Sequence, residues 1–373
     1  MSYSFFATAA KGTEPALRDE LREIRVPGVR ADRGGVHFSG ELRDAYRVCL
    51  WSRVAIRVLL RMGEIHAPDG DALYEGVQTF PWDEHIDATR TLSVSAHARD
   101  SALTHTNFIA QRTKDAIVDQ IRTRVGARPS VDREDADIQI FVHVLRDRAS
   151  VYLDLVGESL HRRGYRAESR EAPLKENLAA AMVRLSGWDR RKPFADPMCG
   201  SGTIAIEAAM YAAGIAPALA RARFGFERWA SFDDAARAHI ADLRSEARAR
   251  AEAPTKMPDI FAADIDPRSV ALTTKNAQTA GVKLTTAVQS VFELGPVDPP
   301  GFIVTNPPYG VRISGGENFE EMLADLFSSL HGHTVSVLCA TPDLENAMRA
   351  RPTRRQPLFN GDIECRLINW LIP

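Results

Sequence analysis

The chain has 373 residues, of which 45% are hydrophobic and 26% charged, and its formal net charge is −2. This composition excludes a wholly disordered, collagen-like or coiled-coil chain, and the length predicts two or three domains. No run approaches the roughly 18 apolar residues of a membrane helix. The start has no basic region ahead of its apolar part, so we expect no signal peptide. Four widely separated cysteines without a CxxC pair predict a reducing, cytoplasmic setting and no zinc site.

Basic residues are unevenly distributed on this nearly neutral chain. Between Arg162 and Lys192 nine basic residues stand against four acidic ones, and a second cluster lies at 349–355. Most of the basic residues are arginine, and a compositional bias alone would explain this. The local clusters nevertheless suit a polyanionic partner.

In chain order, the first part of the sequence predicts strand, helix, strand and helix. These elements are expected over residues 4–8, 14–24, 36–39 and 42–60. From about residue 61 a second α+β unit is expected, with an alternating strand, an amphipathic helix that turns Phe108 inward, and two paired strands. Its elements are expected over 91–98, 107–125, 138–145 and 149–156.

A polar, basic segment rich in turn-forming residues follows and predicts a linker at 161–176. Strands and helices then alternate, which is typical of a doubly wound parallel sheet. The expected strands are 193–196, 260–264, 285–288, 302–305 and 335–340. An antiparallel hairpin, 354–359 with 363–372, is expected around the Asn360-Gly361 turn.

The first candidate site is the turn that follows the strand at 193–196. Gly200 and Gly202 lie between this strand and an expected helix at 204–213. Glycine allows close backbone approach, and a helix N-terminus offers unpaired N–H groups. The preceding Asp196 would repel a pyrophosphate, so the turn favours a cationic ligand over a dinucleotide. The alternative is that these residues form only a tight strand–helix turn and bind no ligand.

The second candidate site is Asp264, at the end of the next strand. A carboxylate in this place can accept hydrogen bonds from both hydroxyls of a ribose. Asp266, followed by Pro267, is expected to cap the next helix. The unusually long separation from the glycine turn predicts an inserted helical segment at 216–256.

The third candidate site is Asn306-Pro307-Pro308-Tyr309, at the end of the fourth strand. Two prolines fix the backbone, so that the Asn306 amide and the Pro307 carbonyl point outward together. Both oxygens can accept hydrogen bonds from an exocyclic amino group, and Tyr309 offers a flat surface for a base.

These motifs resemble those of S-adenosylmethionine-dependent N-methyltransferases. The segment Leu160–Arg166 with Ala172–Leu178 is similar to the THUMP-containing guanine-N2 RNA methyltransferases, and most of all to the N-terminal half of the fused bacterial 23S rRNA enzymes. The resemblance covers nearly the whole chain, and the second methyltransferase of the fusion is expected to be absent. It implies an α/β fold: a class I, Rossmann-like doubly wound sheet with a C-terminal antiparallel hairpin, preceded by an α+β module. The implied domains are ferredoxin-like (1–60), THUMP (61–160), linker (161–176) and methyltransferase (177–373).

The resemblance also implies roles for single residues. Asn306, Pro307 and Tyr309 would hold the target guanine and serve catalysis. The family usually has an acid after the third strand that hydrogen-bonds the adenine amino group. This chain has Gln289-Ser290 there, so one of these two residues is implied to make that contact. The other implied cofactor-binding residues are Pro173, Leu174 and Glu176 from the linker, Asp196, Cys199, Gly200, Gly202 and Thr203 around the methionine end, Asp264 at the ribose, Ile265 at the adenine, and Asn306.

The function that follows is methyl transfer from S-adenosylmethionine to the exocyclic N2 of a guanine in 23S rRNA. The alternatives are the same chemistry on tRNA, glutamine-N5 methylation of a protein, and a non-catalytic RNA-binding assembly factor. We expect a cytoplasmic monomer without a metal or a membrane partner, and no general base is evident. Asn107, Arg112 and Lys114 on the helix at 107–125 are candidate RNA contacts, although a solvated helix face would look the same.

Overall fold

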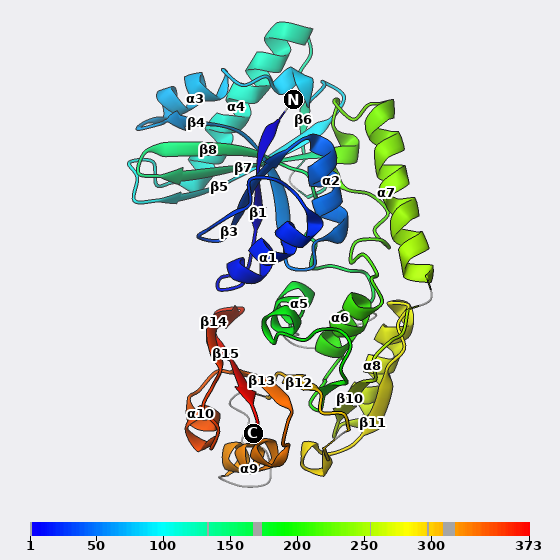
Figure 1. The fold of residues 1–373 in the computed structure, drawn as a ribbon. Helices are drawn as coiled ribbons and strands as arrows, with labels where there is room; N and C mark the ends of the chain where they lie inside the picture. Colours follow the sequence, from blue (N-terminus) through cyan, green and yellow to red (C-terminus); the bar gives the residue numbers. More distant parts are fainter. Residues whose placement is uncertain (1, 133, 167–173, 254, 297, 309–317) are drawn as a thin grey trace.

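The structure is a computed structural model that describes residues 2–132, 134–166, 174–253, 255–296, 298–308 and 318–373. It contains two sheets, one in the N-terminal module and one in the C-terminal half (Figure 1). Within the described residues, no helix has both the length and the apolar character needed to cross a bilayer.

The first sheet has eight strands in the order β2-β3-β1-β4-β8-β7-β5-β6. The strands are β1 (Tyr3–Thr8), β2 (Arg30–Asp32), β3 (Gly35–Gly40), β4 (Arg57–His66), β5 (Thr91–Arg99), β6 (Ser130–Val131), β7 (Ile138–Leu145) and β8 (Arg148–Asp154). The helices of this module are α1 (Glu14–Ile24), α2 (Leu42–Trp51), α3 (Gly70–Val77), α4 (Thr106–Val125) and the short 3-10 helix η1 (Trp82–Glu84).

Strand β4 joins the two parts of the N-terminal module. It pairs with β1 on one side and with β8 on the other, so the sheet is continuous across residue 60. The predicted helix over 42–60 is therefore wrong beyond Trp51. The cause is the buried Glu20, whose carboxylate accepts hydrogen bonds from the Ser52 hydroxyl and from the N–H groups of Arg53 and Val54. These bonds end the helix and release the chain into β4.

The second sheet has seven strands in the order β11-β10-β9-β12-β13-β15-β14. The strands are β9 (Phe194–Asp196), β10 (Ile260–Asp264), β11 (Thr285–Val288), β12 (Phe302–Thr305), β13 (Thr334–Cys339), β14 (Arg354–Asn360) and β15 (Ile363–Leu371). The first five in sheet order are parallel, whereas β15 is antiparallel to both of its neighbours. Counted from β9, the order is 3-2-1-4-5-7-6. The predicted doubly wound sheet with a closing hairpin is confirmed.

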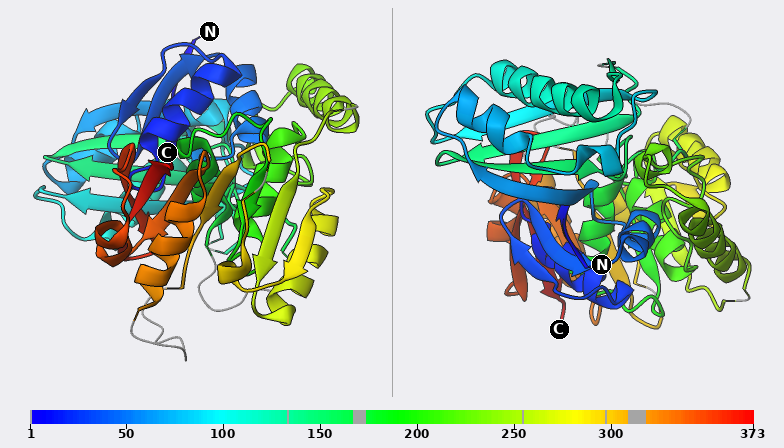
Figure 2. Two further views of the ribbon diagram at one scale, coloured as in Figure 1. Left: turned by 60° about the horizontal axis from the view of Figure 1, so that its bottom comes forward. Right: turned by 90° about the horizontal axis from the view of Figure 1, so that it is seen from above.

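Helices cover both faces of the second sheet (Figure 2). The helices of this half are α5 (Glu176–Leu185), α6 (Thr203–Ala212), α7 (Asp234–Glu252), α8 (Pro267–Thr279), α9 (Phe319–Ser329), α10 (Asp343–Ala347) and the short 3-10 helices η2 (Gly225–Arg228) and η3 (Val291–Glu293). Of these, α7 contacts α2 and η2 contacts β7 of the N-terminal module. The expected insertion thus contains η2 and α7. Asp266 caps α8 as predicted, since its carboxylate accepts a hydrogen bond from the Arg268 N–H at 2.9 Å.

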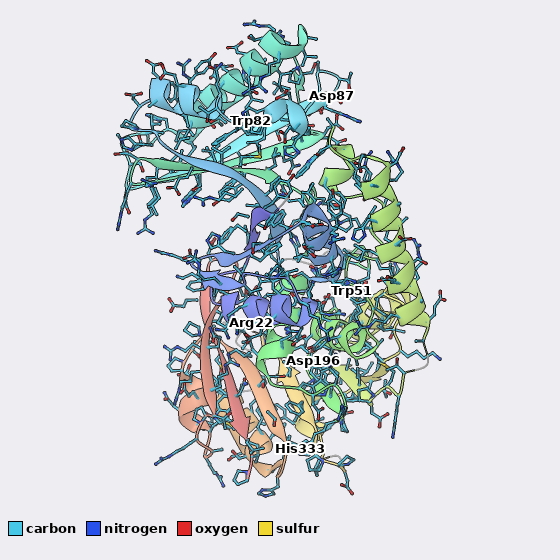
Figure 3. All side chains as sticks on the ribbon, turned by 45° about the horizontal axis from the view of Figure 1, so that its top comes forward. Arg22, Trp51, Trp82, Asp87, Asp196 and His333 are labelled. Atoms are coloured by element: carbon cyan, nitrogen blue, oxygen red, sulfur yellow. The ribbon has the colours of Figure 1, made fainter. Side chains whose placement is uncertain are left out.

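A single hydrophobic cluster runs from the N-terminal module through α5 and α6 to the second sheet, and a separate cluster lies under α9 and α10. Figure 3 labels Trp82 in the first module, Asp196 at the end of β9, and His333 just before β13. Phe108 is 49% exposed, so its predicted inward orientation is wrong. The adjacent Ile109, which the helical pattern also predicts to face inward, is fully buried on α4, since successive helical residues are turned by about 100°.

Candidate cofactor and substrate site

A cavity of 410 Å³ lies at the carboxyl ends of β9, β10, β11 and β12. Parallel α/β sheets bind ligands at this edge. The structure brings five of the predicted site residues together here: Gly200, Asp264, Ile265, Ser290 and Asn306. The cavity is also lined by residues that the sequence analysis missed: Pro197, Met198, Val291, Phe292, Pro308, Phe319 and Met322.

The glycine turn serves two purposes. Gly200 has φ +55°, and a Cβ built there would meet no atom within 4 Å, so its backbone borders open space in the cavity. Gly202 has φ +82°, and its Cβ would lie 2.6 Å from Cγ2 of Thr273 on α8. Gly202 therefore permits the packing of α6 against α8 and does not line the cavity.

Alanine substitutions should separate these two purposes. Gly202→Ala should cost about 2–4 kcal/mol of unfolding free energy, because it adds overpacking to the strain of a positive φ. Gly200→Ala should cost only about 1–2 kcal/mol of strain but weaken cofactor binding about tenfold by filling the cavity. Urea denaturation and calorimetric titration with S-adenosylmethionine measure the two effects. Equal effects of both variants on binding would contradict this division.

Asp196 is 1% exposed and does not itself line the cavity, although the next residue, Pro197, does. Its Oδ1 accepts a hydrogen bond from the Thr305 hydroxyl at 2.8 Å. Burial raises the pKa of Asp196 to about 7, even though hydrogen bonds from Thr305 and from the Met198 backbone favour the carboxylate. A cationic ligand nearby would restore the charged form.

Cofactor affinity should therefore depend on pH. Below about pH 7 the carboxyl must lose a proton before it can attract a cation, so affinity for S-adenosylmethionine should fall up to about tenfold per pH unit and level off above pH 7. The unliganded fold should show the opposite trend. Its raised pKa makes the contribution of Asp196 to stability decrease as the pH rises from about 4 to about 7. Titration calorimetry of wild type and Asp196→Asn tests this, and an unchanged slope in the variant would rule Asp196 out as the cause.

Asp264 connects the second strand to the glycine turn. Its Oδ2 accepts a hydrogen bond from the Gly200 N–H at 2.9 Å, and its Oδ1 accepts one from the Asp266 N–H at 2.9 Å. Each carboxylate oxygen has a second lone pair, so the group can still accept hydrogen bonds from a ribose. Ile265 beside it is 74% exposed, which leaves an apolar surface at the cavity.

The structure distinguishes the two candidates at the end of β11. Ser290 lines the cavity, and its hydroxyl accepts a hydrogen bond from the Phe292 N–H at 3.4 Å. Gln289 is turned away, with its amide donating to the Glu293 carbonyl at 2.9 Å. Phe292 and Phe319 face each other edge to plane, with ring centroids 5.8 Å apart. Phe292 could have been found from its place just after β11.

At the end of β12, Asn306 and Pro308 line the cavity, whereas Pro307 is buried beside a second, smaller cavity. Tyr309 and Pro173 lie outside the described residues. Cys199 is buried, and burial raises the pKa of its thiol, with Sγ 3.5 Å from the Thr273 hydroxyl. A buried thiol of raised pKa is a poor nucleophile.

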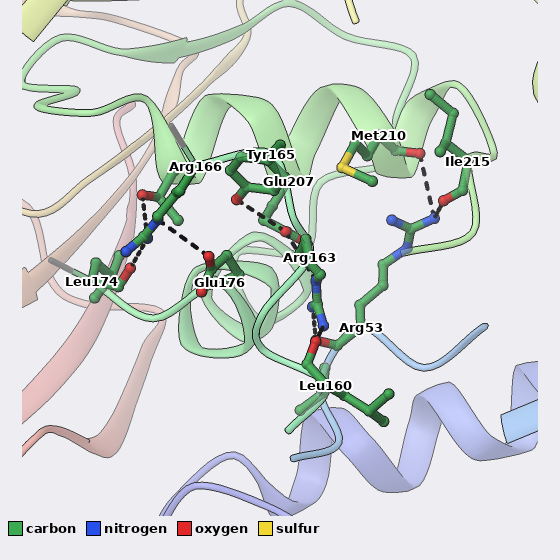
Figure 4. Close-up of polar contacts among 12 residues, drawn as sticks. Arg53, Leu160, Arg163, Tyr165, Arg166, Leu174, Glu176, Glu207, Met210 and Ile215 are labelled. Carbon is green, nitrogen blue, oxygen red and sulfur yellow. Dashed lines mark hydrogen bonds and ion pairs between the residues drawn. The ribbon is translucent and has the colours of Figure 1, made fainter. Parts of the chain in front are cut away.

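The remaining predicted residues are Leu174, Glu176 and Thr203, and all three contact Arg166. Figure 4 shows Leu174 and Glu176 beside Arg166. The Arg166 guanidinium donates to the Leu174 carbonyl and to the Thr203 hydroxyl, and it pairs with Glu176 at 3.2 Å. None of these residues lines the cavity. They fix the first turns of α5 and α6, and the sequence analysis missed Arg166 as their common partner.

A second buried arginine connects the methyltransferase half to the N-terminal module (Figure 4). Arg163 pairs with Glu207 of α6 at 3.3 Å, and it donates hydrogen bonds to the carbonyls of Leu160 and Arg53. Tyr165 also donates to Glu207, at 3.2 Å. The basic cluster seen in the sequence is thus partly internal, and its arginines stabilise the joint between the modules.

The predicted RNA contacts on α4 are also partly engaged within the module. Arg112 pairs with Asp71 at 2.6 Å and stacks on Tyr74, and Lys114 pairs with Asp115 at 2.6 Å. Asn107 is exposed. In the described part of the chain, no group of three or more His, Cys, Asp or Glu residues could hold a metal ion.

Comparison with known proteins matches three parts of the chain to family models. Residues 163–369 match the RMKL-like methyltransferase domain, residues 67–154 the THUMP domain, and residues 4–59 the RlmL ferredoxin-like domain. The ribosomal RNA large subunit methyltransferase K/L of Syntrophotalea carbinolica is 43% identical, over 98% of this chain and 53% of that protein. The chain spans about half the length of the curated relatives it matches.

Several solved structures cover the whole chain, including the two that follow. SMU.472, crystallised with S-adenosylhomocysteine, has a TM-score of 0.90 and 30% identity, with 98% of that chain covered. A protein of Listeria monocytogenes, described as a predicted N6-adenine-specific DNA methylase, has a TM-score of 0.89 and 30% identity, with 97% covered.

The residues around the cavity suit S-adenosylmethionine. Asp264 can accept hydrogen bonds from a ribose, Gly200 leaves room for close approach, and Ile265 and Phe292 offer apolar surface to an adenine. The sheet order, this cavity and its relatives define a class I methyltransferase that uses S-adenosylmethionine. Within that class, the chain belongs to the RMKL-like methyltransferase family.

Proposed function

We propose that this chain methylates the exocyclic N2 of a guanine in 23S rRNA. The observation that carries the proposal is that one cavity combines the glycine turn and Asp264 with Asn306 and Pro308. The names of the K/L relatives support ribosomal RNA as the substrate class. The match to a THUMP domain at 67–154 supports an RNA-selecting role for the N-terminal module.

S-adenosylmethionine, when bound, supplies an activated methyl group. The Asn306 side-chain oxygen, at the cavity, would accept a hydrogen bond from the N2 amino group and hold its lone pair in line with that methyl group. The Pro307 carbonyl is the second acceptor that the sequence predicts, although Pro307 itself borders the smaller cavity. The N–C bond then forms as the C–S bond breaks, and N2 loses its extra proton to water. No described carboxylate other than Asp264 lines the cavity, so we assign no general base. A base within a duplex must leave its stack to reach this cavity.

The test is methyl transfer from labelled S-adenosylmethionine to protein-free 23S rRNA, bulk tRNA and a release-factor-like protein, followed by digestion to nucleosides or amino acids. The proposal predicts label in N2-methylguanosine from 23S rRNA. Label in tRNA alone would replace the proposal with tRNA methylation. Label in N6-methyladenosine would replace it with adenine methylation, and label in protein glutamine would replace it with protein methylation. Cofactor binding without any transfer would favour a non-catalytic assembly factor.

A further inference from the structure

The eight-stranded sheet carries its helices on one face. Phe5, Leu60, Leu153 and Ile140 are opposite one another on successive strands and are all buried in the cluster that includes α1, α2 and α4. Because side chains alternate along a strand, their sequence neighbours point to the other face. Figure 1 shows α3 and α4 on one side of β4, β8, β7 and β5, and none of the described α-helices of this module lies on the other.

A row of aromatic side chains crosses this helix-free face. Phe6 lies 4.7 Å from His37 and 6.4 Å from Tyr152, and Tyr152 lies 6.4 Å from Phe141, measured between ring centroids. His97 and His143 continue the row with centroids 5.8 Å apart and ring planes within 4°. Tyr152 is 8% exposed and supports its neighbours, whereas Phe6 and Phe141 are half-buried and His97 is exposed.

Positive charge accompanies the rings. The strands place five arginines and three acids on this face, although the whole chain has a net charge of −2. The arginines are Arg30, Arg57, Arg61, Arg99 and Arg148, and the acids are Asp32, Glu64 and Asp154. Glu64 is shared by Arg61 and Arg148, which leaves one positive charge in excess beside Tyr152.

One end of the helix-free face lies next to residues of the methyltransferase half. Arg57 and Gln139 also line a cavity of 730 Å³, together with Arg221, Arg223 and Arg228 from the region of the insertion and with four acids, Glu134, Asp135, Asp137 and Glu158. Residues 157–164 form one wall of this cavity, and Arg57 donates to the Gly157 carbonyl at 2.8 Å. The same segment continues to Arg166 at the first turn of α6.

We propose that the helix-free face of the eight-stranded sheet binds a single-stranded segment of the RNA substrate, with bases stacked on Phe6, Phe141 and His97. This inference rests on the proposed function for the identity of the nucleic acid. Sheet-borne aromatic rings that stack splayed bases are a general mode of single-strand RNA recognition. Arginines beside the rings neutralise the backbone phosphates. An acidic or purely apolar partner would not match this alternation of rings and guanidinium groups.

The test is fluorescence anisotropy of a labelled oligouridine with the full chain. Phe141→Ala and His97→Ala should each weaken binding about fivefold to a hundredfold. Phe141→Trp should retain affinity, and its tryptophan emission should be quenched by the RNA. Phe108→Ala is the matched control, because Phe108 is an exposed ring on the helix-covered side of the same module. Thermal unfolding and cofactor affinity report whether each variant is folded.

Unchanged RNA affinity in folded Phe141→Ala and His97→Ala would overturn the inference. An equal loss in Phe108→Ala would do the same and move the RNA to α4. The binding assay needs no methyl transfer. If both variants bind RNA more weakly while the wild type methylates no rRNA, the RNA-binding surface is supported and the proposed substrate is rejected.

Discussion

Replacement of Glu207 by glutamine should lower the unfolding free energy by about 3–5 kcal/mol. The side chains of Glu207 and its partner Arg163 are 0% and 1% exposed, so the variant leaves a guanidinium buried without its counter-charge. Tyr165 loses a charged acceptor as well. The pair lies where α6 meets the N-terminal module, so the loss should also appear as a looser joint between the two halves.

The measurement is urea denaturation followed by far-ultraviolet circular dichroism. The double variant Arg163→Met with Glu207→Leu should recover part of the loss, because replacing both members of a buried pair is far less costly than replacing one. Recovery should be incomplete, since the Leu160 and Arg53 carbonyls lose their donor. The control is Glu158→Gln, which removes an exposed pair with Arg162 and should cost less than about 1 kcal/mol. Similar effects of the two single variants would refute the argument.

Removal of the Asn306 side chain by alanine should lower kcat by about 10²–10³-fold, the usual effect of deleting one preorganised hydrogen-bonding group at a reacting centre. The amide would hold the amino group that accepts the methyl, so its loss affects the chemical step. Cofactor affinity should change little, because the remaining lining, including Gly200 and Asp264, is untouched.

Ser290→Ala provides the contrast. Ser290 lines the same cavity on the side of Ile265 and Phe292, so its loss should raise the KM for S-adenosylmethionine severalfold, as expected for one hydrogen bond, and leave kcat nearly unchanged. Single-turnover methyl transfer with 23S rRNA separates the two constants. A pure KM effect in Asn306→Ala would reassign Asn306 from the base to the cofactor.

Local sequence patterns predicted most strands, because period-two alternation and short apolar runs do not depend on distant residues. The strands at 260–264, 285–288 and 302–305 have the predicted bounds. The helix over 42–60 failed because apolar spacing continues past Trp51, while the group that ends the helix, Glu20, lies on α1. No local pattern reveals a carboxylate that reaches back from another helix.

The candidate site shows the same limit. Gly200, Asp264, Ser290 and Asn306 follow strand ends, and parallel topology alone brings such positions to one edge. Phe319 and Met322 reach the cavity from α9, which follows β12 only after a long connection, so spacing along the chain gave no indication of them. Arg163 and Arg166 were assigned to a basic cluster that suits a polyanionic partner, because their internal pairing depends on α6, on α5 and on residues as distant as Arg53.

Strand β4 has a consequence for how a target could be chosen. Because it is hydrogen-bonded into both parts of the first sheet, the N-terminal module has no hinge at residue 60. The hydrophobic cluster that this module shares with α5 and α6 removes a second place to bend. The shared core therefore favours a fixed distance between the first sheet and the cavity. An RNA bound at the first sheet would then place in the cavity a nucleotide at a fixed distance along the strand from the bound segment. The choice of target nucleotide would depend on this spacing as well as on the base itself.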